Sequence, residues 1–579
     1  MVRDTTVDGD CGAVAYPLSP MQQGMLFHHA EGAAPGIDVE QVVCEMEHPI
    51  GAAEFEQAWQ AMVRRHDTLR TGFIWSEGGE PRQVVSPPDT VAISVRVLEL
   101  ADAATARRMV QQYLASDRRT GFATLAAPLA RVALFRGGDR RAWFVFTYHH
   151  LILDARGMLT LFRELMEYHD ALVRGETVDW PEPRPYRDYI AWLETLDQHR
   201  AEAFWREQLR GLASPTLLPL PAPDVDARSE GPGELAFRLS EAETRRLRAA
   251  AERHGVTLNT MLQAAWAVVL SRYTGEDDIV FGAVRACRHI PVEGAAAMVG
   301  LLINTVPVRV RLAPAASIGH WVRALREQWL AIRDFEPTPL ARIQQCTDLP
   351  AGRPLFDTLF NFQEPSWMHA LNRLGGRWTQ REFDIRSQPN YPLALDIYGD
   401  PELLVRAFYN ARQFDAAAVG RLLGHYRAAI QSLMDPQVDT LAEVTLLDAP
   451  ERDLVIRQWN RTAAEDPLDV CVHELFERQA VEQADRIAIA DSRDALSYAE
   501  LNRRANALAR RLRALGVQSD TLVAVCLPRS IELIVAWLGV LKSGGAFVSL
   551  DPAYPRERLD FQIRDSAARV VITAPASGS

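Results

Sequence analysis

The sequence predicts a mixed α/β protein with more than one folded unit. Residues 143–146 (WFVF) form a continuous apolar run of β-favouring side chains, the pattern of a strand buried on both faces. From Gly157 the period changes, and the apolar positions of MLTLFRELMEYHDAL recur at helical spacing. The chain has 579 residues. A domain commonly takes about 100–200 residues, so several hydrophobic cores are expected.

Other segments repeat these helix and strand patterns. Residues 54–70 have an amphipathic helix pattern, and residues 258–273 form a strongly apolar helix pattern. A short strand is expected at 278–284, and a second strand from Thr305, where apolar residues alternate. Residues 211–233 are rich in Pro, Ala and Asp and lack periodicity, so we interpret them as a linker between two lobes.

The residues that indicate chemistry stand where the buried strand ends and the helix begins. His149 and His150 are adjacent, and successive strand residues point to opposite faces, so one can face a cleft while the other packs inward. Asp154 follows three apolar residues and needs a partner if it is buried. A metal site is the alternative. We predict none, because a metal needs three or four ligands and no further His or Cys pair stands nearby at ligand spacing.

Two other histidine-containing segments are interpreted as structural. His28 and His29 follow the helix-start signal Ser19–Pro20 and are expected to be ordinary helix residues. His66–Asp67 stands in the charge-dense segment RRHDTLR, which favours an ion-pair cluster over a catalytic pair.

Composition excludes several classes of function. The net charge of −12 argues against a nucleic-acid-binding surface. No apolar stretch of about 18 residues is present, so no membrane span is expected, and the N-terminus lacks an apolar signal core. The six cysteines do not stand at paired spacings, so we expect reduced thiols, as in a cytoplasmic protein. They are Cys11, Cys44, Cys287, Cys346, Cys471 and Cys526.

The segment HHLILDA (149–155) resembles the HHxxxDG signature of condensation domains in non-ribosomal peptide synthetases, which chloramphenicol-acetyltransferase-like acyltransferases share. Three more segments resemble motifs of that family: YPLSPMQQGMLFHHA (16–30), VGLLINTVPVRVR (299–311) and PLFDTLFNFQ (354–363). The form LSPMQxGMLFH is similar to the subtype that accepts a donor ending in a D-residue. The resemblance implies two chloramphenicol-acetyltransferase-like lobes in a V, with the active site between them, and residues 364–390 are expected to be irregular and to cross over the first lobe.

The same resemblance implies amide formation between two thioesters on the phosphopantetheine arms of carrier proteins. His150 matches the catalytic residue, as general base or as hydrogen-bond partner of the tetrahedral intermediate. His149 is assigned to structure. Asp154 matches a structural carboxylate that pairs with an arginine of the other lobe, which aligns best with Arg288.

The sequence departs from the family pattern beside the motif. Ala155 replaces the motif glycine. If the backbone there needs a positive φ, alanine is strained by about 1 kcal/mol or more; otherwise the change is mild. Arg156 stands where the family often has an aromatic residue. Arg156 and Arg285 are expected to border the acceptor channel, and Asn304 of the INTVPVR segment is a further candidate channel residue.

The end of the chain resembles the start of an adenylation domain. Residues 541–552 (LKSGGAFVSLDP) match an opening motif, and Lys542 lacks the GxxxxGK[ST] spacing of a phosphate loop. The family's nucleotide loop lies further on, so we expect no adenylation activity from these residues. The expected organisation begins with an N-terminal extension (1–15) and a condensation domain (16–447), which has an N-lobe at about 16–210 and a C-lobe at about 234–447. A linker (448–467), an adenylation fragment (468–575) and an appended tail (576–579) follow.

The resemblance also implies the partners. Upstream and downstream peptidyl carrier domains and an adjacent adenylation domain are expected, with no directly bound cofactor, no nucleic acid, no membrane and a monomeric chain. Two alternatives remain: an epimerisation domain, which shares HHxxxDG but continues differently from ARGMLT, and a non-catalytic recruitment domain, which usually loses the histidine pair. No GxSxG nucleophile elbow supports a hydrolase.

Overall fold

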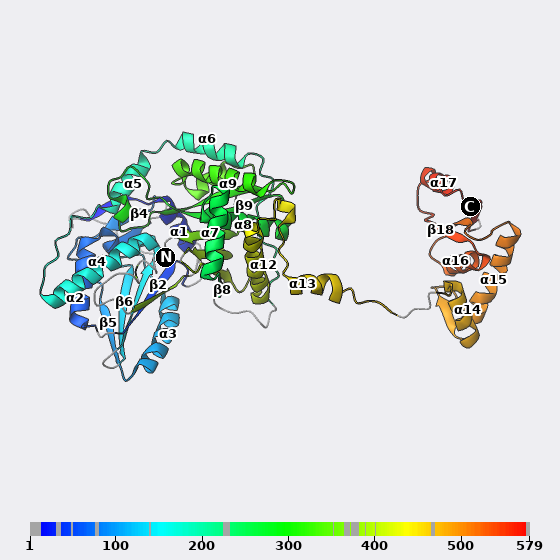
Figure 1. The fold of residues 1–579 in the computed structure, drawn as a ribbon, viewed down its shortest axis with the longest axis horizontal. Coiled ribbons are helices and arrows are strands. Elements are labelled where there is room, and N and C mark those ends of the chain that lie inside the picture. The colour runs from blue at the N-terminus through cyan, green and yellow to red at the C-terminus, as the bar shows by residue number, and fades with distance from the viewer. Residues whose placement is uncertain are drawn as a thin grey trace. The chain divides into compact units, whose positions relative to one another are not determined.

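The computed structural model of the chain forms two compact units, Met1–Asp453 and Leu454–Ser579, drawn in Figure 1. No helix within the described ranges is long and apolar enough to cross a membrane. The structure describes residues 13–30, 36–47, 50–75, 80–137, 141–223, 232–350, 352–363, 371, 381–387, 390–399, 401–464 and 469–574.

The N-lobe of the first unit is organised around a five-stranded sheet of order β12-β2-β7-β6-β5. β7 lies at its centre, antiparallel to both β2 and β6. All eight residues of β7 are buried, which confirms the strand predicted from WFVF. The strands are β2 (Val39–Met46), β5 (Val95–Leu100), β6 (Ala130–Gly137), β7 (Ala142–His149) and β12 (Arg381–Arg386).

Helices cover both faces of this sheet, which explains why successive residues of β7 are apolar. On one face Phe144 and Phe146 pack against α2 and α4, and Trp59 of α2 stacks on Phe146 with ring centroids 4.8 Å apart. On the other face Trp143 and Val145 pack against α3, and Figure 1 labels this helix beside the strands of the sheet. The helices are α2 (Ala52–Arg65), α3 (Ala103–Thr120) and α4 (Ala155–Arg174).

The helix predicted over 54–70 ends earlier than expected, at Arg65. His66 is extended, and a short 3₁₀ turn, η1 (Asp67–Arg70), follows. The predicted ion-pair cluster lies at this helix end. The His66 Nε2 lies 2.8 Å from Glu164 of α4, and Arg70 pairs with Asp67. The structural interpretation of His66–Asp67 is therefore confirmed.

The rest of the N-lobe is a small sheet and three helices. β1, β4 and β3 form a three-stranded antiparallel sheet. His28 and His29 lie on α1, and their side chains fall outside the described part of the structure. The elements are β1 (Val14–Pro17), α1 (Pro20–Ala30), β3 (Thr71–Ile74), β4 (Arg82–Val85), α5 (Tyr186–Glu194) and α6 (Gln198–Leu209).

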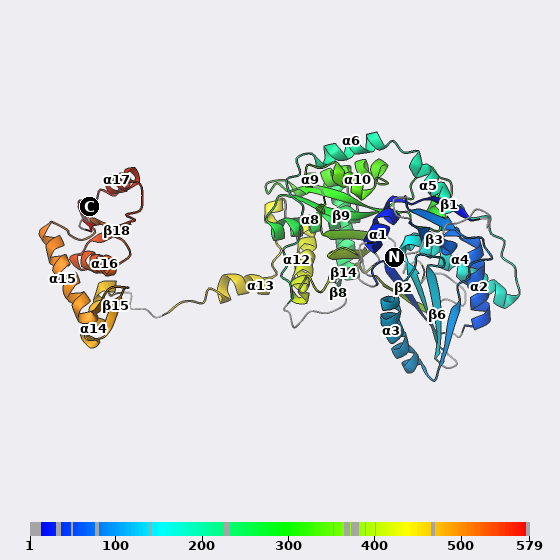
Figure 2. The same cartoon turned by 180° about the vertical axis from the view of Figure 1, so that it is seen from behind.

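The C-lobe contains a six-stranded sheet of order β10-β9-β11-β13-β14-β8. Its strands are β8 (Pro232–Arg238), β9 (Asp278–Ala286), β10 (Ile303–Arg311), β11 (Thr358–Gln363), β13 (Leu393–Tyr398) and β14 (Leu404–Asn410). Figure 2 shows α12 beside β8 and β14. The helices are α7 (Glu241–His254), α8 (Leu258–Thr274), α9 (Ile318–Ile332), α10 (Leu340–Gln345) and α12 (Ala416–Met434), with short turns η4 (Ala295–Ala297), η5 (Arg333–Phe335) and η7 (Leu441–Glu443).

The predicted buried helix of the C-lobe is confirmed in α8. The Thr257 side chain caps its first turn by accepting a hydrogen bond from the Thr260 N–H, and Gly275 ends it in the left-handed conformation at φ 74°. Most of the helix is buried in the C-lobe core. β9 and β10 confirm the two strands that the sequence predicts, and β10 begins at Ile303, two residues earlier than the alternation suggests.

One strand of the N-lobe sheet comes from the C-lobe part of the chain. β12 pairs antiparallel with β2 over all six of its residues, with Asp384 opposite Val43. The sequence predicts an irregular segment here, but Phe383 and Ile385 alternate with polar residues and pack into the N-lobe core. The expected crossover to the first lobe is therefore confirmed for 381–386, and residues 364–370 and 372–380 lie outside the described residues.

The second unit is a smaller α/β body. β18, β17 and β19 form a parallel sheet, and β15 and β16 form a hairpin. Lys542 is buried and donates to Glu477 and, at 2.7 Å, to Asn502, so it is held by protein groups. The first unit ends with the short helix α13 (Ala449–Asp453), and the second begins with a short π-helix, η8 (Leu454–Gln458). The further elements of the second unit are α14 (Val472–Glu482), β15 (Ile487–Ala490), β16 (Ala495–Ser497), α15 (Tyr498–Ala514), β17 (Leu522–Cys526), α16 (Ile531–Ser543), β18 (Ala546–Leu550), α17 (Arg556–Asp565) and β19 (Val570–Thr573).

Candidate active site

The two histidines of the motif occupy different environments at the end of β7. His149 is 3% exposed, its Nδ1 accepts the Leu151 N–H at 3.2 Å, and its ring lies 6.0 Å from that of Phe122. His150 begins the 3₁₀ turn η2 (His150–Ile152) and is only half-buried. The strand end therefore directs one ring into the N-lobe and leaves the other partly accessible.

The hydrogen bonds of His150 fix the tautomer of its ring. Its backbone N–H donates to the Asp38 carbonyl at 2.8 Å, and its Nδ1 lies 2.8 Å from the Leu153 carbonyl oxygen. A carbonyl oxygen only accepts, so Nδ1 carries the proton and Nε2 holds the lone pair. Within the described ranges Nε2 has no hydrogen-bond partner. This is the state of a histidine that can accept a proton at Nε2.

Asp154 connects the two lobes. Its Oδ1 accepts from the Gly157 N–H at 2.7 Å and from the Arg288 Nη2 at 2.5 Å, and its Oδ2 accepts from the Leu302 N–H at 2.8 Å. The Arg288 Nη1 also donates to the carbonyls of Ala295 and Met298. Both side chains of the ion pair are almost fully buried. The carboxylate thus caps α4 of the N-lobe and binds the C-lobe at the same time.

The alanine at the glycine position of the motif fits the backbone. Ala155 is the first residue of α4, with Asp154 as its N-cap, and it is not among the described residues with positive φ. Of the two cases that the sequence left open, the structure therefore supports the mild one. A tighter constraint lies two residues on, at Gly157, where a Cβ would stand 3.0 Å from the Gly300 N of the C-lobe.

Arg156 and Arg285 line one cavity of about 210 Å³ next to the motif. Arg285 is held in place, because it pairs with Glu336 at 2.8 Å and lies 3.8 Å above the ring of Trp329. Burial raises the pKa of Glu336, and Arg285 opposes that shift. Asn304 is not among the residues lining this cavity. It is buried, and its amide donates to the Glu336 and Thr338 carbonyls, each at 2.7 Å.

Two carboxyl groups that the sequence reasoning missed interact electrostatically with His150. Asp38 precedes β2 in the N-lobe, and Asp396 lies on β13 in the C-lobe. Burial raises the pKa of each to about 6, and the charge of His150 acts in the opposite direction. Asn361 donates to Asp396 at 3.1 Å.

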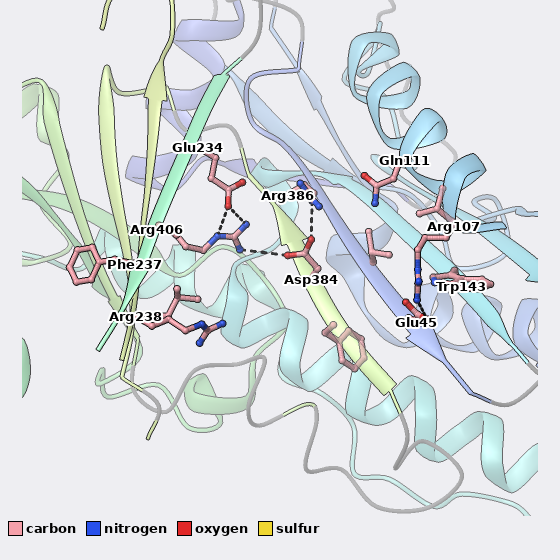
Figure 3. A pocket seen from close by; sticks show the side chains of 15 residues that line it. Glu45, Arg107, Gln111, Trp143, Glu234, Phe237, Arg238, Asp384, Arg386 and Arg406 are labelled. Atoms are coloured by element: carbon pink, nitrogen blue, oxygen red, sulfur yellow. Dashed lines mark hydrogen bonds and ion pairs between the residues drawn. The ribbon is translucent and has the colours of Figure 1, made fainter. Parts of the chain in front are cut away.

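A larger cavity of about 610 Å³ opens between the lobes where α3, β12 and β8 meet (Figure 3). Most of its charged side chains form ion pairs. Arg107 bonds Glu45 at 2.7 Å, and Arg406 bonds Glu234 at 2.7 Å and lies 3.6 Å from Asp384. Four arginines and three carboxylates line this cavity, and none of the motif residues lines it.

The described residues contain no group of three or more His, Cys, Asp or Glu side chains arranged to hold a metal ion. Four of the described cysteines are free thiols: Cys287, Cys346, Cys471 and Cys526.

Comparison with protein families gives two matches in this chain. The condensation-domain family matches residues 13–455, and the AMP-binding enzyme family matches residues 476–579. One linear gramicidin synthase protein of Brevibacillus parabrevis is 35% identical over 564 residues, which are 96% of this chain and 11% of the relative. Bacitracin synthase 3 of Bacillus licheniformis is 32% identical over 561 residues, 96% of this chain and 9% of the relative. The chain thus spans about a tenth of the length of these relatives.

Solved structures share the fold. A four-domain nonribosomal peptide synthetase bound to AMP and glycine aligns with a TM-score of 0.73 at 18% identity, over 98% of this chain and 44% of that one. The first condensation domain of the calcium-dependent antibiotic synthetase, in complex with a substrate analogue, aligns with a TM-score of 0.63 at 19% identity, over 76% of this chain and all of that one. The condensation-domain match spans most of the chain, including the junction that carries His150. The chain therefore belongs to the condensation domains, the peptide-bond-forming domains of nonribosomal peptide synthetases, and continues into part of an AMP-binding adenylation domain.

Proposed function

We propose that residues 16–447 join an upstream carrier-bound acyl or peptidyl thioester to the amine of a downstream carrier-bound aminoacyl thioester. The observation that carries this proposal is the state of His150. Its Nδ1–H is held by the Leu153 carbonyl, and its Nε2 lone pair lacks a partner in the described structure. A group in that state can take a proton from an attacking amine.

The proposed steps conserve atoms and charge. The amine nitrogen attacks the thioester carbonyl, and a C–N bond forms while His150 Nε2 accepts the ammonium proton. The tetrahedral intermediate then collapses, the C–S bond breaks, and the proton passes to the departing thiolate. Holding both substrates in near-attack geometry is worth about 7–11 kcal/mol, and a positioned base adds about 10²–10⁴-fold. His150 therefore supplies part of the acceleration and positioning supplies the larger part.

We further propose that the donor ends in a D-configured residue, because LSPMQQGMLFH (18–28) resembles the D-accepting subtype. The carriers come from neighbouring regions or other chains, since no LGGxS-like carrier serine is present in these residues. The adenylation segment of this sequence lacks the family's nucleotide loop, so these 579 residues alone are proposed to form no aminoacyl adenylate.

A single-turnover assay with two loaded carriers tests the reaction. The native protein should form a new amide, with faster turnover of a D-terminated than of an L-terminated donor. His150→Ala should slow amide formation by at least about 10²-fold, and His199→Ala on α6, an exposed histidine outside the site, should leave it unchanged. Near-native amide formation by His150→Ala with native thermal stability would remove His150 from the mechanism. An epimerised donor or no product with native protein would favour the epimerisation or recruitment alternative.

Arg156 and Arg285 are proposed to border the acceptor channel, because both line the cavity beside the motif. The alanine variants of the two arginines should differ in their effect on stability. Arg156 is exposed and forms no ion pair with the described residues, so Arg156→Ala should change the range of acceptors with little loss of stability. Arg285→Ala removes the partner of buried Glu336 and should lower stability as well. An unchanged acceptor range in both variants would contradict the proposal.

A further inference from the structure

The cavity beside the motif carries an excess of positive charge. Four guanidinium groups line it, from Arg156, Arg285, Arg288 and Arg333, and Glu336 is the carboxylate among its lining residues. It draws on both lobes, because Arg156 lies on α4 of the N-lobe and the other three arginines belong to the C-lobe. Its excess of positive charge is greater than that of the larger interlobe cavity, which four arginines and three carboxylates line.

Existing ion pairs account for two of the four arginines. Arg285 pairs with Glu336, and Arg288 pairs with Asp154. Arg156 and Arg333 are exposed, and within the described part of the chain neither has an ion-pair or hydrogen-bond partner through its side chain. Two positive charges at the cavity therefore lack a direct ion-pair partner among the described residues, although Arg333 interacts electrostatically with Glu336 at longer range.

Arg288 contributes a fixed positive charge to the cavity wall. It is 5% exposed, its Nη2 donates to Asp154, and its Nη1 donates to the carbonyls of Ala295 and Met298. These bonds hold the guanidinium group in place, so the two exposed arginines are the side chains that can move to meet a substrate group.

The size of the cavity limits what enters it. Pockets for whole small molecules are typically about 300–1,000 Å³, and this cavity measures about 210 Å³. It therefore accommodates a functional group of a larger substrate. The buried Gln263, whose amide donates to Asn259 at 3.0 Å, adds polar atoms to the same wall.

We propose that this cavity binds an anionic oxygen group, a carboxylate or a phosphate, carried by one of the tethered substrates. Arg156 and Arg333 supply the charge. The inference rests on the proposed condensation reaction and specifies its substrate. Two sources share this chemistry: an acidic side chain of the donor or acceptor residue, and the phosphate of the pantetheine arm.

The test compares kcat/KM for matched substrates in the condensation assay. One arm uses carrier-bound aspartyl and asparaginyl substrates, first as acceptors and then as donor termini. The other arm uses soluble acceptor and donor thioesters of 4′-phosphopantetheine and of pantetheine without phosphate. Native protein is compared with Arg156→Gln, with Arg333→Gln and with their double variant. Arg163→Gln, an exposed arginine of α4 that does not line the cavity, is the matched control.

In one of the two arms, native protein should prefer the anionic substrate at least about tenfold. The double variant should abolish that preference while Arg163→Gln retains it, and raising the salt concentration should weaken it. A preference in the aspartyl arm assigns the anion to a side chain, and one in the phosphate arm assigns it to the carrier arm. Equal rates for anionic and neutral substrates, with amide still formed, would overturn this inference and leave the condensation proposal standing. Absence of amide from every substrate would instead overturn the condensation proposal, and this inference with it.

Discussion

Arg288 of the C-lobe donates to Asp154 of the N-lobe at 2.5 Å, with both side chains almost fully buried. Asp154 is also the N-cap of α4, and its second oxygen accepts from the Leu302 N–H beside β10. The helix that follows the motif is therefore anchored to the opposite lobe by its first residues. The short loop between His150 and Asp154 is held at its Asp154 end by this arrangement and at its other end by the hydrogen bond from the His150 N–H to the Asp38 carbonyl.

Removing one partner of this pair should destabilise the protein strongly. Asp154→Ala leaves Arg288 buried and uncompensated, and breaking a buried pair in this way costs about 3–5 kcal/mol. We expect reduced soluble yield and a lower urea midpoint. The double variant Asp154→Ala/Arg288→Met removes both charges and should recover part of the loss. A double variant as unstable as the sum of its single variants would show that the pair itself contributes nothing.

Restoring the family's glycine at position 155 should lower the stability of the protein slightly. Ala155 is helical in this chain. Glycine costs about 0.5–1 kcal/mol relative to alanine inside a helix, so Ala155→Gly should lower the free energy of unfolding by up to that amount. Condensation activity should stay within about twofold, a change of about 0.4 kcal/mol in barrier. Chemical denaturation and the single-turnover assay measure the two effects, and a clear gain in stability would contradict the helical conformation.

Gly157 should not accept a side chain. An added Cβ would lie 3.0 Å from the Gly300 N and 3.1 Å from the Gly300 O of the C-lobe, both backbone atoms. Gly157→Ala should therefore push α4 away from the C-lobe, at a cost of about 1–3 kcal/mol. Gly24→Ala on α1 is the control, because nothing lies within 4 Å of its added Cβ, and it should be neutral or stabilising. Equal melting temperatures for the two variants would contradict the close approach.

The buried carboxyl of Asp357 should make stability depend on pH. Burial raises its pKa to about 6 from 3.8. Between these two values the folded state binds more protons than the unfolded state, so this group's contribution falls as pH rises from about 4 through 6. Asp357→Asn removes the titration. Its melting temperature relative to native protein should therefore be higher at pH 8 than at pH 4.5. A pH-independent difference would contradict the raised pKa.

Local sequence signals predict the elements that carry the motif. The apolar run of β7 and the helical period of α4 are set by packing on both faces of one sheet and along one helix face, and both effects are visible in a short window. The partnership of Asp154 with Arg288 was predicted from the family motif, since the two residues lie 134 positions apart. Whether His150 catalyses the reaction remains a prediction for the assay above.

Contacts between distant segments were beyond the reach of the sequence. Asp38 and Asp396 come from different lobes and both interact electrostatically with His150, and neither belongs to a recognisable local pattern. β12 was predicted as irregular because its six residues alternate for too short a distance to stand out. The presence of Arg156 and Arg333 at the same cavity likewise depends on how the two lobes meet.

The crossing of β12 has a consequence for engineering this domain. The strand is encoded after most of the C-lobe, yet it completes the edge of the N-lobe sheet by pairing with β2. A chimaera joined within residues 211–233 would combine β2 of one parent with β12 of the other. Phe383 and Ile385 would then enter a foreign core. Recombination that exchanges the halves of this domain must therefore transplant β12 together with its host sheet, or exchange the domain whole.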